Sequence, residues 1–440
     1  MTPMLATAHK LAAKHFHPAT WAYSSATSRD YRLDMLRGFL VLMMIVDHIG
    51  GDSLLTVITG KNQFLASAAE GFVFVSGTLL GIVYGNRIRR LGLATGVMAL
   101  LRRAAVLYVA TVGLTLAFIA LYLFTEVPIW MDRASGLGVD TTLKALVGTL
   151  TLHFTYHGTD MLIIYVFMIA AAPLAFYALS KGHWAHVLGI SWSIWALSQV
   201  APAQVSLPWT VENSIFSTNV WQVLFYTGLV IGYHRNQLSR VARILGHPAV
   251  VAAAAVAFVG MMMLSRLHLA DRLSELGLVW FDNDAFDIVF GKLHLGPGRI
   301  VAFAVVAILV WQLVTRLWQP LRLALGWLLM PLGQKALFAY GAHLFFIGPA
   351  NAWFADALYG GQGGVLGATF VHGGAVVLVS LLARSYPVVS SYIQDAIQVV
   401  RNPARAADDI AKATAPAVVA VCSSNSGRSS LTGQDSSDRL

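Results

Sequence analysis

The stretch LDMLRGFLVLMMIVDHIGG, residues 33–51, is apolar enough to cross a lipid bilayer, yet it contains Asp34, Arg37, Asp47 and His48. At 100° per residue, Asp34, Arg37 and His48 fall on one side of a helix, whereas Asp47 points about 100° away from His48. Because charged groups in lipid cost several kcal/mol, such a stripe faces the interior of a helix bundle or a water-filled cavity. We therefore expect this helix to form one wall of a polar path through a membrane.

The composition of the chain is typical of an integral membrane protein. Of its 440 residues, 57% are hydrophobic and 12% are charged, and the mean hydropathy is +0.66. A soluble chain carries roughly 25% charged residues. The net charge of +9 does not indicate nucleic acid, because basic residues of membrane proteins gather in cytoplasmic loops. Cys422 is the single cysteine, which excludes an intrachain disulfide and a thiolate metal centre.

The apolar segments predict an all-α integral membrane protein, a polytopic bundle of about ten transmembrane helices. These lie at residues 33–51, 68–85, 104–124, 160–180, 185–200, 219–234, 249–264, 299–317, 335–350 and 365–384. Lys and Arg concentrate in the loops after the even-numbered helices, which predicts that both termini are cytoplasmic. We predict a cytoplasmic N-terminal leader at 1–30, a transmembrane domain at 31–386, and a cytoplasmic, largely disordered tail at 387–440.

The first helix carries residues suited to proton transfer and to anion binding. In the predicted orientation, Asp34 and Arg37 lie at its cytoplasmic end and His48 lies near its outer end. Arg binds phosphate or carboxylate through a planar fork, and His is a natural general base for a hydroxyl near neutral pH. This pattern favours an anionic donor that reaches across the membrane to a base. The alternative is a local i,i+3 pair of Asp34 with Arg37 at the interface, with His48 only capping the helix.

The second predicted helix begins with AAEGFVFVSGTLLGIVYG, residues 68–85. Gly77, Gly81 and Gly85 recur every four residues, a spacing that lets another helix backbone approach closely. Glu70 opens this helix at the outer surface, near the end of the first helix. Two interpretations of Glu70 stay open: it tunes the histidine or holds an acceptor, or it is simply solvated.

The spacing LDxLRG, with a His fourteen residues after the Asp, resembles the transmembrane acyltransferase superfamily, whose members move acyl groups from cytoplasmic acyl-CoA to extracytoplasmic acceptors. FVFVSGTLLG at 72–81 and GQKALFAYGAHLFF at 333–346, with Tyr340 and His343, are similar to two later segments of that superfamily. More narrowly, the chain resembles the OpgC family of glucan succinyltransferases, through RDYRLDMLRGF, DHIGG, AEGFVFVSG, TDMLIIYV, NVWQVLFYTG and KLHLGPGRIVAF in that order.

The resemblance implies roles for individual residues. His48 would be the base that deprotonates an acceptor hydroxyl as it attacks the thioester. Arg37, oriented by Asp34, would line the acyl-CoA channel. If the acyl group is a dicarboxylate, a second cation should meet its free carboxylate, and Arg299 is the candidate; the alternative is that Arg299 snorkels at the interface. The candidates for acceptor binding, on the predicted outer side, are Asp47, Asp160, Tyr165, Trp221 and Gln222.

The chain departs from the family pattern at two places. Gly50 stands where Pro usually follows DHI, and HLGPGR at 294–299 replaces TLGPLR, which leaves the geometry of the acceptor loop open. A lone histidine such as His343, in the middle of an apolar helix, is also typical of a hydrogen-bonded packing residue.

We therefore expect a membrane-bound O-acyltransferase of the bacterial inner membrane. It would move a succinyl or another short acyl group from cytoplasmic acyl-CoA to a hydroxyl of a periplasmic glucan. Its expected partners are membrane lipid and the exported glycan, not nucleic acid. Succinyl-CoA or another acyl-CoA is a co-substrate, and we expect no permanently bound cofactor and no metal, because the spacing of His153, His157 and Asp160 fixes no complete ligand set.

The alternative function is a proton-coupled transporter or flippase of a glycan or lipid-linked sugar. Ionisable residues inside a membrane also mark transport pathways. The chain has no convincing internal repeat, which argues against a transporter built from inverted halves.

Overall fold

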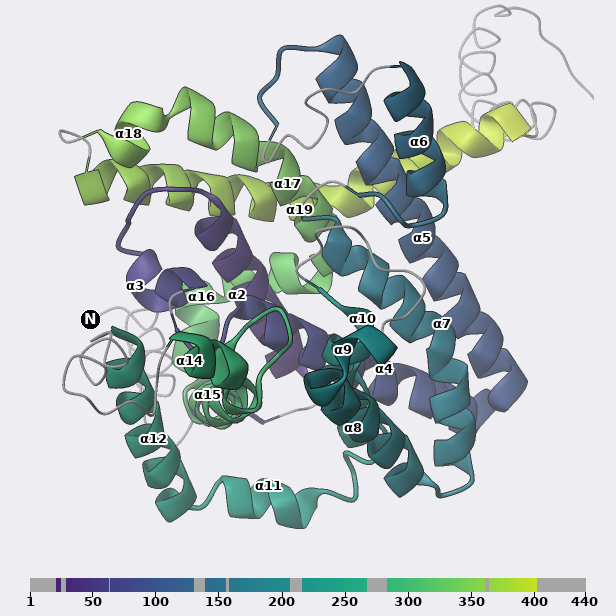
Figure 1. Ribbon diagram of the computed structural model, residues 1–440, viewed down its shortest axis with the longest axis vertical. Helices are drawn as coiled ribbons and strands as arrows, with labels where there is room; N and C mark the ends of the chain where they lie inside the picture. Colours follow the sequence, from purple (N-terminus) through teal and green to yellow (C-terminus); the bar gives the residue numbers. More distant parts are fainter. Residues whose placement is uncertain are drawn as a thin grey trace, which may run out of the picture. The chain divides into compact units, whose positions relative to one another are not determined.

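Helices are the only regular elements in the part of the chain that the computed structural model describes, which comprises residues 21–24, 29–62, 64–129, 139–155, 158–205, 216–266, 283–360 and 364–401 (Figure 1). They are α2 (Tyr31–His48), α3 (Thr56–Thr59), the short 3-10 helix η2 (Gly60–Asn62), α4 (Ala68–Leu91), α5 (Leu93–Phe124), α6 (Val139–Leu150), α7 (Asp160–Ser180), α8 (Trp184–Val200), α9 (Pro202–Val205), α10 (Thr218–Tyr233), α11 (Ser239–Leu245), α12 (Pro248–Arg266), α14 (Asn283–Phe290), α15 (Pro297–Arg316), α16 (Trp318–Gln334), α17 (Ala336–Trp353), α18 (Ala355–Tyr359) and α19 (Gly364–Arg401).

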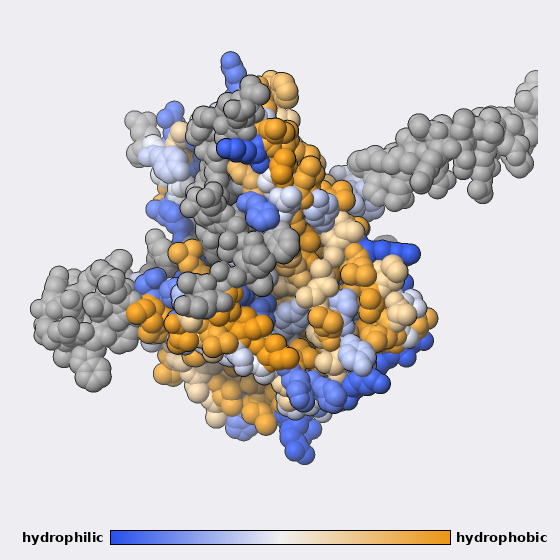
Figure 2. All heavy atoms as spheres, turned by 45° about the vertical axis from the view of Figure 1, so that its right-hand side comes forward, coloured by the Kyte–Doolittle hydropathy of each residue, from blue (hydrophilic) through white to orange (hydrophobic). Residues whose placement is uncertain are grey.

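The all-α prediction is confirmed, with six candidate membrane-spanning helices in the described residues. They are Ala68–Leu91, Leu93–Phe124, Asp160–Ser180, Pro248–Ser265, Pro297–Arg316 and Gly364–Pro387. Hydrophobic side chains cover much of the face drawn in Figure 2. Four more predicted spans correspond to α2, α8, α10 and α17; α8 and α10 are short, at 17 and 16 residues, and α2 carries four charged side chains. Ten spans, and the sides of the termini, stay predictions.

The glycine stripe on α4 packs closely against α10. A Cβ added to Gly77 or Gly81 would lie 2.0 or 2.1 Å from a backbone carbonyl oxygen of α10. The contact is reciprocal, because a Cβ added to Gly228 or Gly232 would lie 2.3 or 2.0 Å from a carbonyl oxygen of α4. Gly85, at the end of the stripe, meets a side chain of α10 instead. The prediction of close backbone approach is confirmed.

Helix α16 corrects the sequence prediction, which placed a cytoplasmic loop between the eighth and ninth spans. This helix packs against the beginning of α2, where a Cβ on Gly333 would lie 1.7 Å from the carbonyl oxygen of Asp34. From the α2 side, a Cβ on Gly38 would lie 1.9 Å from the carbonyl oxygen of Leu329. Pro320 lies in the first turn of α16, where proline is tolerated, and Gly333 permits the close approach to α2.

The last helix differs from prediction at its end. The chain divides into two compact units after Ala383, and α19 begins in the first unit and continues to Arg401 in the second. The predicted disordered tail begins at 387, so its first residues are helical. The remainder of that tail, like residues 1–20 of the leader, lies outside the described residues.

Candidate active site

Two histidines from distant parts of the chain form a stacked pair. His48 is the last residue of α2, and His343 lies in α17. Nδ1 of His48 is 3.1 Å from Nε2 of His343, and the two rings stack with centroids 5.4 Å apart and planes inclined by 19°. His343 is buried, and its Nδ1 is hydrogen-bonded to the backbone carbonyl oxygen of Tyr340.

With both rings neutral, these contacts set the proton positions. A carbonyl oxygen only accepts hydrogen bonds, so Nδ1 of His343 carries a proton and its Nε2 is the acceptor. His48 must then donate from Nδ1, which leaves its basic lone pair on Nε2. If Nε2 gains a proton, the bond to His343 is kept. A histidine held in one tautomer and one orientation has the properties that a general base requires.

Glu70 forms a buried ion pair with Arg299 at the start of α15. Nε of Arg299 donates to Oε1 of Glu70, and both side chains are almost fully enclosed. The other carboxylate oxygen accepts from the backbone nitrogen and the hydroxyl of Ser67, at 2.8 and 2.7 Å, and closes a capping box at the start of α4. The solvated interpretation of Glu70 is therefore wrong. Arg299, which was predicted to meet a donor carboxylate, already binds a carboxylate of the protein.

Lys292 is a charged residue of this region that the sequence prediction missed. It lies in the turn before α15, within electrostatic range of Glu70, Arg299, Asp47 and Asp160. Burial lowers the pKa of Lys292 from its ordinary value, the charge of Glu70 opposes this, and the charge of Arg299 adds to it. The only signal in the sequence was its position at the head of KLHLGPGR.

The turn that carries Lys292 is anchored by α8. Trp195 donates from Nε1 to the carbonyl oxygen of Leu295 at 3.1 Å, and Gln199 donates from Nε2 to that of His294 at 2.7 Å. Leu295 is fully buried, and its backbone adopts the left-handed conformation, with φ of 49°. This conformation costs roughly 1–2 kcal/mol for a residue other than glycine. These contacts define the geometry of HLGPGR, which the sequence left open.

Two predicted acidic residues lie within electrostatic range of Lys292. Asp160 is the first residue of α7, is buried, and accepts from the backbone nitrogen of Met161 at 3.0 Å. Asp47 is half-buried and, like Asp160, lies within electrostatic range of Lys292. The helical wheel separated Asp47 from the face of His48, and in the structure Asp47 lies within electrostatic range of Lys292.

A cavity of about 160 Å³ lies among α2, α4, α5, α7, α10 and α17. Its lining includes Arg37 and Arg103, together with the aromatic rings of Phe72, Tyr165 and Tyr340. Cζ of Arg37 is 6.0 Å from the ring centroid of Phe72, and its Nε is buried without a hydrogen-bond acceptor among the described residues. The ring of Tyr340 is centred 5.1 Å from that of His343, so the cavity wall reaches the histidine pair.

Asp34 has a different partner from the one predicted. Its carboxylate is buried and accepts from Nε of Arg29 at 2.8 Å. Arg29 precedes α2 and reaches the carboxylate from the beginning of the helix, whereas Arg37 lines the cavity. The prediction that Asp34 orients Arg37 through a direct pair is corrected: Asp34 holds the segment that leads into α2.

Trp221 and Gln222 lie within helix packing. The hydroxyl of Ser191 donates to Oε1 of Gln222 at 2.6 Å, and Nε2 of Gln222 donates to the carbonyl oxygens of Ser191 and Asn219 at 2.8 and 3.2 Å. Trp221 is fully buried, with its ring edge-on to that of Phe216 at 4.9 Å. These contacts fasten α10 to α8, and neither residue is part of the cavity lining.

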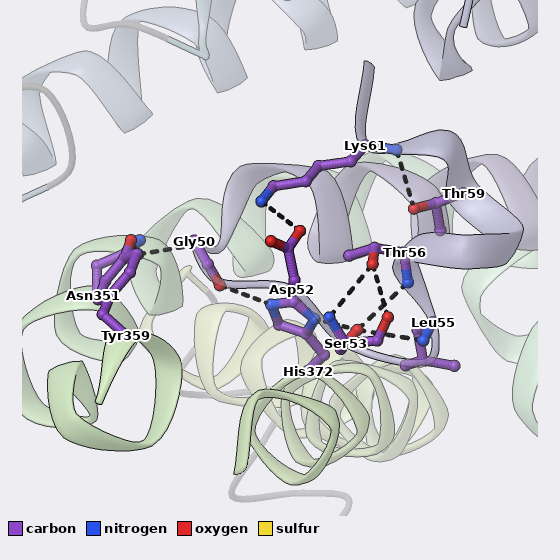
Figure 3. A network of polar contacts seen from close by, with 10 residues as sticks. All are labelled: Gly50, Asp52, Ser53, Leu55, Thr56, Thr59, Lys61, Asn351, Tyr359 and His372. Atoms are coloured by element: carbon purple, nitrogen blue, oxygen red, sulfur yellow. Dashed lines mark hydrogen bonds and ion pairs between the residues drawn. The ribbon is translucent and has the colours of Figure 1, made fainter. Parts of the chain in front are cut away.

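The loop after His48 is fixed from both sides (Figure 3). His372 of α19 approaches the carbonyl oxygen of Gly50 with Nε2 at 3.0 Å and the hydroxyl of Ser53 with Nδ1 at 2.8 Å. The backbone nitrogen of Gly50 donates to Oδ1 of Asn351 at 2.8 Å, and a Cβ on Gly50 would lie 1.6 Å from the hydroxyl of Tyr359. Proline has no backbone N–H and could not donate this hydrogen bond, which explains why this fold has Gly50 where the family usually has proline.

Comparison with known proteins adds a family relationship. A family model described as OpgC protein matches residues 29–389 of the chain. No curated protein and no solved structure matches it.

Proposed function

The chain belongs to the OpgC family, and on that premise we propose that it is a membrane-bound acyltransferase that moves a succinyl or another short acyl group from cytoplasmic acyl-CoA to a hydroxyl of a periplasmic glucan. The observation that carries the proposal is the pairing of His48 with His343, which supports Nε2 of His48 as a general base. Glucan hydroxyls are weak nucleophiles, and such a base contributes typically 10²- to 10⁴-fold to the rate.

In the proposed reaction, His48 removes the proton of the acceptor hydroxyl as its oxygen attacks the thioester carbon. A C–O bond forms, the C–S bond breaks, and the coenzyme A thiolate leaves with the proton that His48 received. His343 keeps its hydrogen bond to His48 throughout, so the imidazolium forms without a change of ring orientation.

The donor enters through the cavity that Arg37 and Arg103 line. Guanidinium groups bind phosphate through paired hydrogen bonds, and the buried Nε of Arg37 is a donor with no acceptor among the described residues. The aromatic wall then guides the acyl arm toward Tyr340, which lies next to His343.

At the acceptor end, Lys292 supplies positive charge for the free carboxylate of a succinyl group. Arg299 is fixed by Glu70, and Lys292, on the turn before it, has an ammonium group with three donors. Asp47 and Asp160 lie within electrostatic range of Lys292, and their carboxylates suit the hydroxyls of a sugar. Tyr165 lines the cavity, on the donor side of the proposed reaction.

The test is transfer of labelled succinyl from succinyl-CoA to glucan by membranes that carry the full chain. We expect His48→Ala to lower transfer by about 10²- to 10⁴-fold. The matched control is His186→Ala, since His186 is exposed on α8 and does not line the cavity. Equal labelling by wild type and His48→Ala would refute the role of His48. No labelling of glucan with succinyl-, acetyl- or other short acyl-CoA would refute acyl transfer itself.

A further inference from the structure

A second groove lies between α12 and α15, away from the cavity described above. It has a volume of about 490 Å³, and apolar side chains of both helices form most of its walls, Phe258 and Leu309 among them. In Figure 1, α12 stands beside α15, and α15 is its main packing partner. Only 6% of the membrane-spanning window of α12 is buried, so this side of the bundle is open to lipid.

One end of the groove is polar. Gln312 and Arg316 both line it and are four residues apart on α15, which places them on one face of the helix. Gln312 is 9% exposed, and its amide has no hydrogen-bond partner among the described residues. A Cβ on Gly246 would lie 3.6 Å from Nε2 of Gln312, and Nη2 of Arg316 donates to the carbonyl oxygen of Gly246 at 2.9 Å. Arg243, three residues earlier on α11, is a second exposed cation.

This end lies far from the proposed chemistry. Gln312 follows Arg299 by thirteen residues on α15, a distance of roughly 20 Å along the helix. The groove and the active-site cavity have no lining residue in common. The groove is therefore a separate site.

We propose that this groove binds one anionic phospholipid. An acyl chain occupies the apolar walls, the phosphate contacts Arg316, and the amide of Gln312 donates to a phosphate or ester oxygen. A purely apolar occupant would leave a buried amide without a hydrogen bond, which costs roughly 1–3 kcal/mol. The volume lies within the roughly 300–1,000 Å³ of small-molecule sites.

Charge argues against an occupant from the chain itself. The nearest segment is the leader, because Gln319 donates its backbone N–H to the carbonyl oxygen of Trp21 at 3.0 Å, three residues after Arg316. Residues 1–20 contain Lys10 and Lys14 and no acidic residue. A basic segment does not complement Arg316 and Arg243, whereas a phosphate does.

The test is native mass spectrometry of the full chain in detergent, titrated with phosphatidylglycerol and with phosphatidylcholine of the same acyl chains. We expect one phosphatidylglycerol to bind at lower concentration than phosphatidylcholine. Arg316→Gln should weaken phosphatidylglycerol about fivefold and Arg316→Lys much less. The control is Arg322→Gln, on an exposed residue of α16 outside the groove, which should change nothing.

Two further variants test the apolar part and the occupant. Leu309→Trp should fill the groove and weaken both lipids, while deletion of residues 1–20 should leave binding unchanged. Equal affinity for the two lipids, or an equal loss in Arg316→Gln and Arg322→Gln, would overturn the proposal. Stronger lipid binding after the deletion would assign the groove to the leader and also overturn it. Thermal unfolding confirms that each variant is folded.

Discussion

Replacement of His343 tests the proposed proton path most directly. His343→Leu removes the acceptor for Nδ1 of His48, so the base loses one hydrogen bond and its fixed tautomer. A buried donor left without an acceptor costs roughly 1–3 kcal/mol. If that cost falls on the transition state, transfer slows by about 5- to 150-fold. We expect the fall in kcat, with KM for succinyl-CoA nearly unchanged, because His343 does not line the cavity.

The matched variant is His343→Gln. Its side-chain oxygen can accept from His48 and its amide N–H can donate to the carbonyl of Tyr340, the two contacts that the imidazole makes. We expect this variant to recover most of the rate of the wild type. Initial rates of labelled succinyl transfer are measured at several donor concentrations, and thermal unfolding verifies that both variants are folded.

A double variant completes the test. Because His343 acts through His48, His48→Ala combined with His343→Leu should be no slower than His48→Ala alone. The reasoning is refuted if His343→Leu retains the wild-type kcat, or if the effects of the two substitutions multiply.

Three further predictions concern the ion pair, the helix contact and Lys292. Glu70→Gln should lower the free energy of unfolding by about 3–5 kcal/mol, because it leaves Arg299 buried without its counter-charge. The control Asp52→Asn, at the exposed ion pair with Lys61, should lower it by only about 0–1 kcal/mol. Similar losses for the two variants in chemical denaturation would contradict this prediction. Gly81→Ala should lower the free energy of unfolding by about 1–3 kcal/mol, because the added methyl group overlaps α10. The control Gly113→Ala, with nothing within 4 Å of its Cβ, should not destabilise the protein. An unchanged unfolding temperature for Gly81→Ala would refute the contact. Since the pKa of Lys292 is lowered, this side chain loses its positive charge at a lower pH than a free lysine does, so the KM for succinyl-CoA should rise as the pH becomes alkaline. Lys292→Arg should move that rise to higher pH, because arginine stays charged. Identical pH profiles of KM for the wild type and Lys292→Arg would exclude Lys292 from donor binding.

Local patterns in the sequence were sufficient for features that depend on one helix face. The helical wheel grouped Arg37 with His48; in the structure Arg37 lines the cavity, and His48 contacts His343, whose ring lies next to the cavity residue Tyr340. The four-residue spacing of the glycines predicted the contact with α10, because small side chains at that spacing leave one face bare.

Pairings between distant segments could not be predicted in this way. His48 and His343 are 295 residues apart, and Glu70 and Arg299 are 229 residues apart. Periodicity states which side of a helix is polar, but it does not state which other helix that side meets. Asp34 shows a second limit, a local one: spacing favoured the i+3 arginine Arg37, whereas the carboxylate pairs with Arg29, five residues earlier.

The missed elements have a similar cause. Lys292 is one charged residue in a short turn, and only the packing of that turn against α8 makes it part of a cluster. The sequence of α16 contains prolines and glycines that lower its intrinsic helix propensity, and its packing against α2 compensates for this.

The reciprocal glycines of α4 and α10 make this contact unusually sensitive to random mutation. Every single-nucleotide missense change in a glycine codon introduces a larger side chain, and at Gly77, Gly81, Gly228 and Gly232 even a methyl group would overlap a backbone carbonyl. A second mutation that shortens a side chain on the opposite helix could not relieve this overlap, because the overlapping atoms belong to the main chain. A screen for loss of function should therefore recover variants along this contact as readily as variants of the histidines, although no glycine in it has a chemical role.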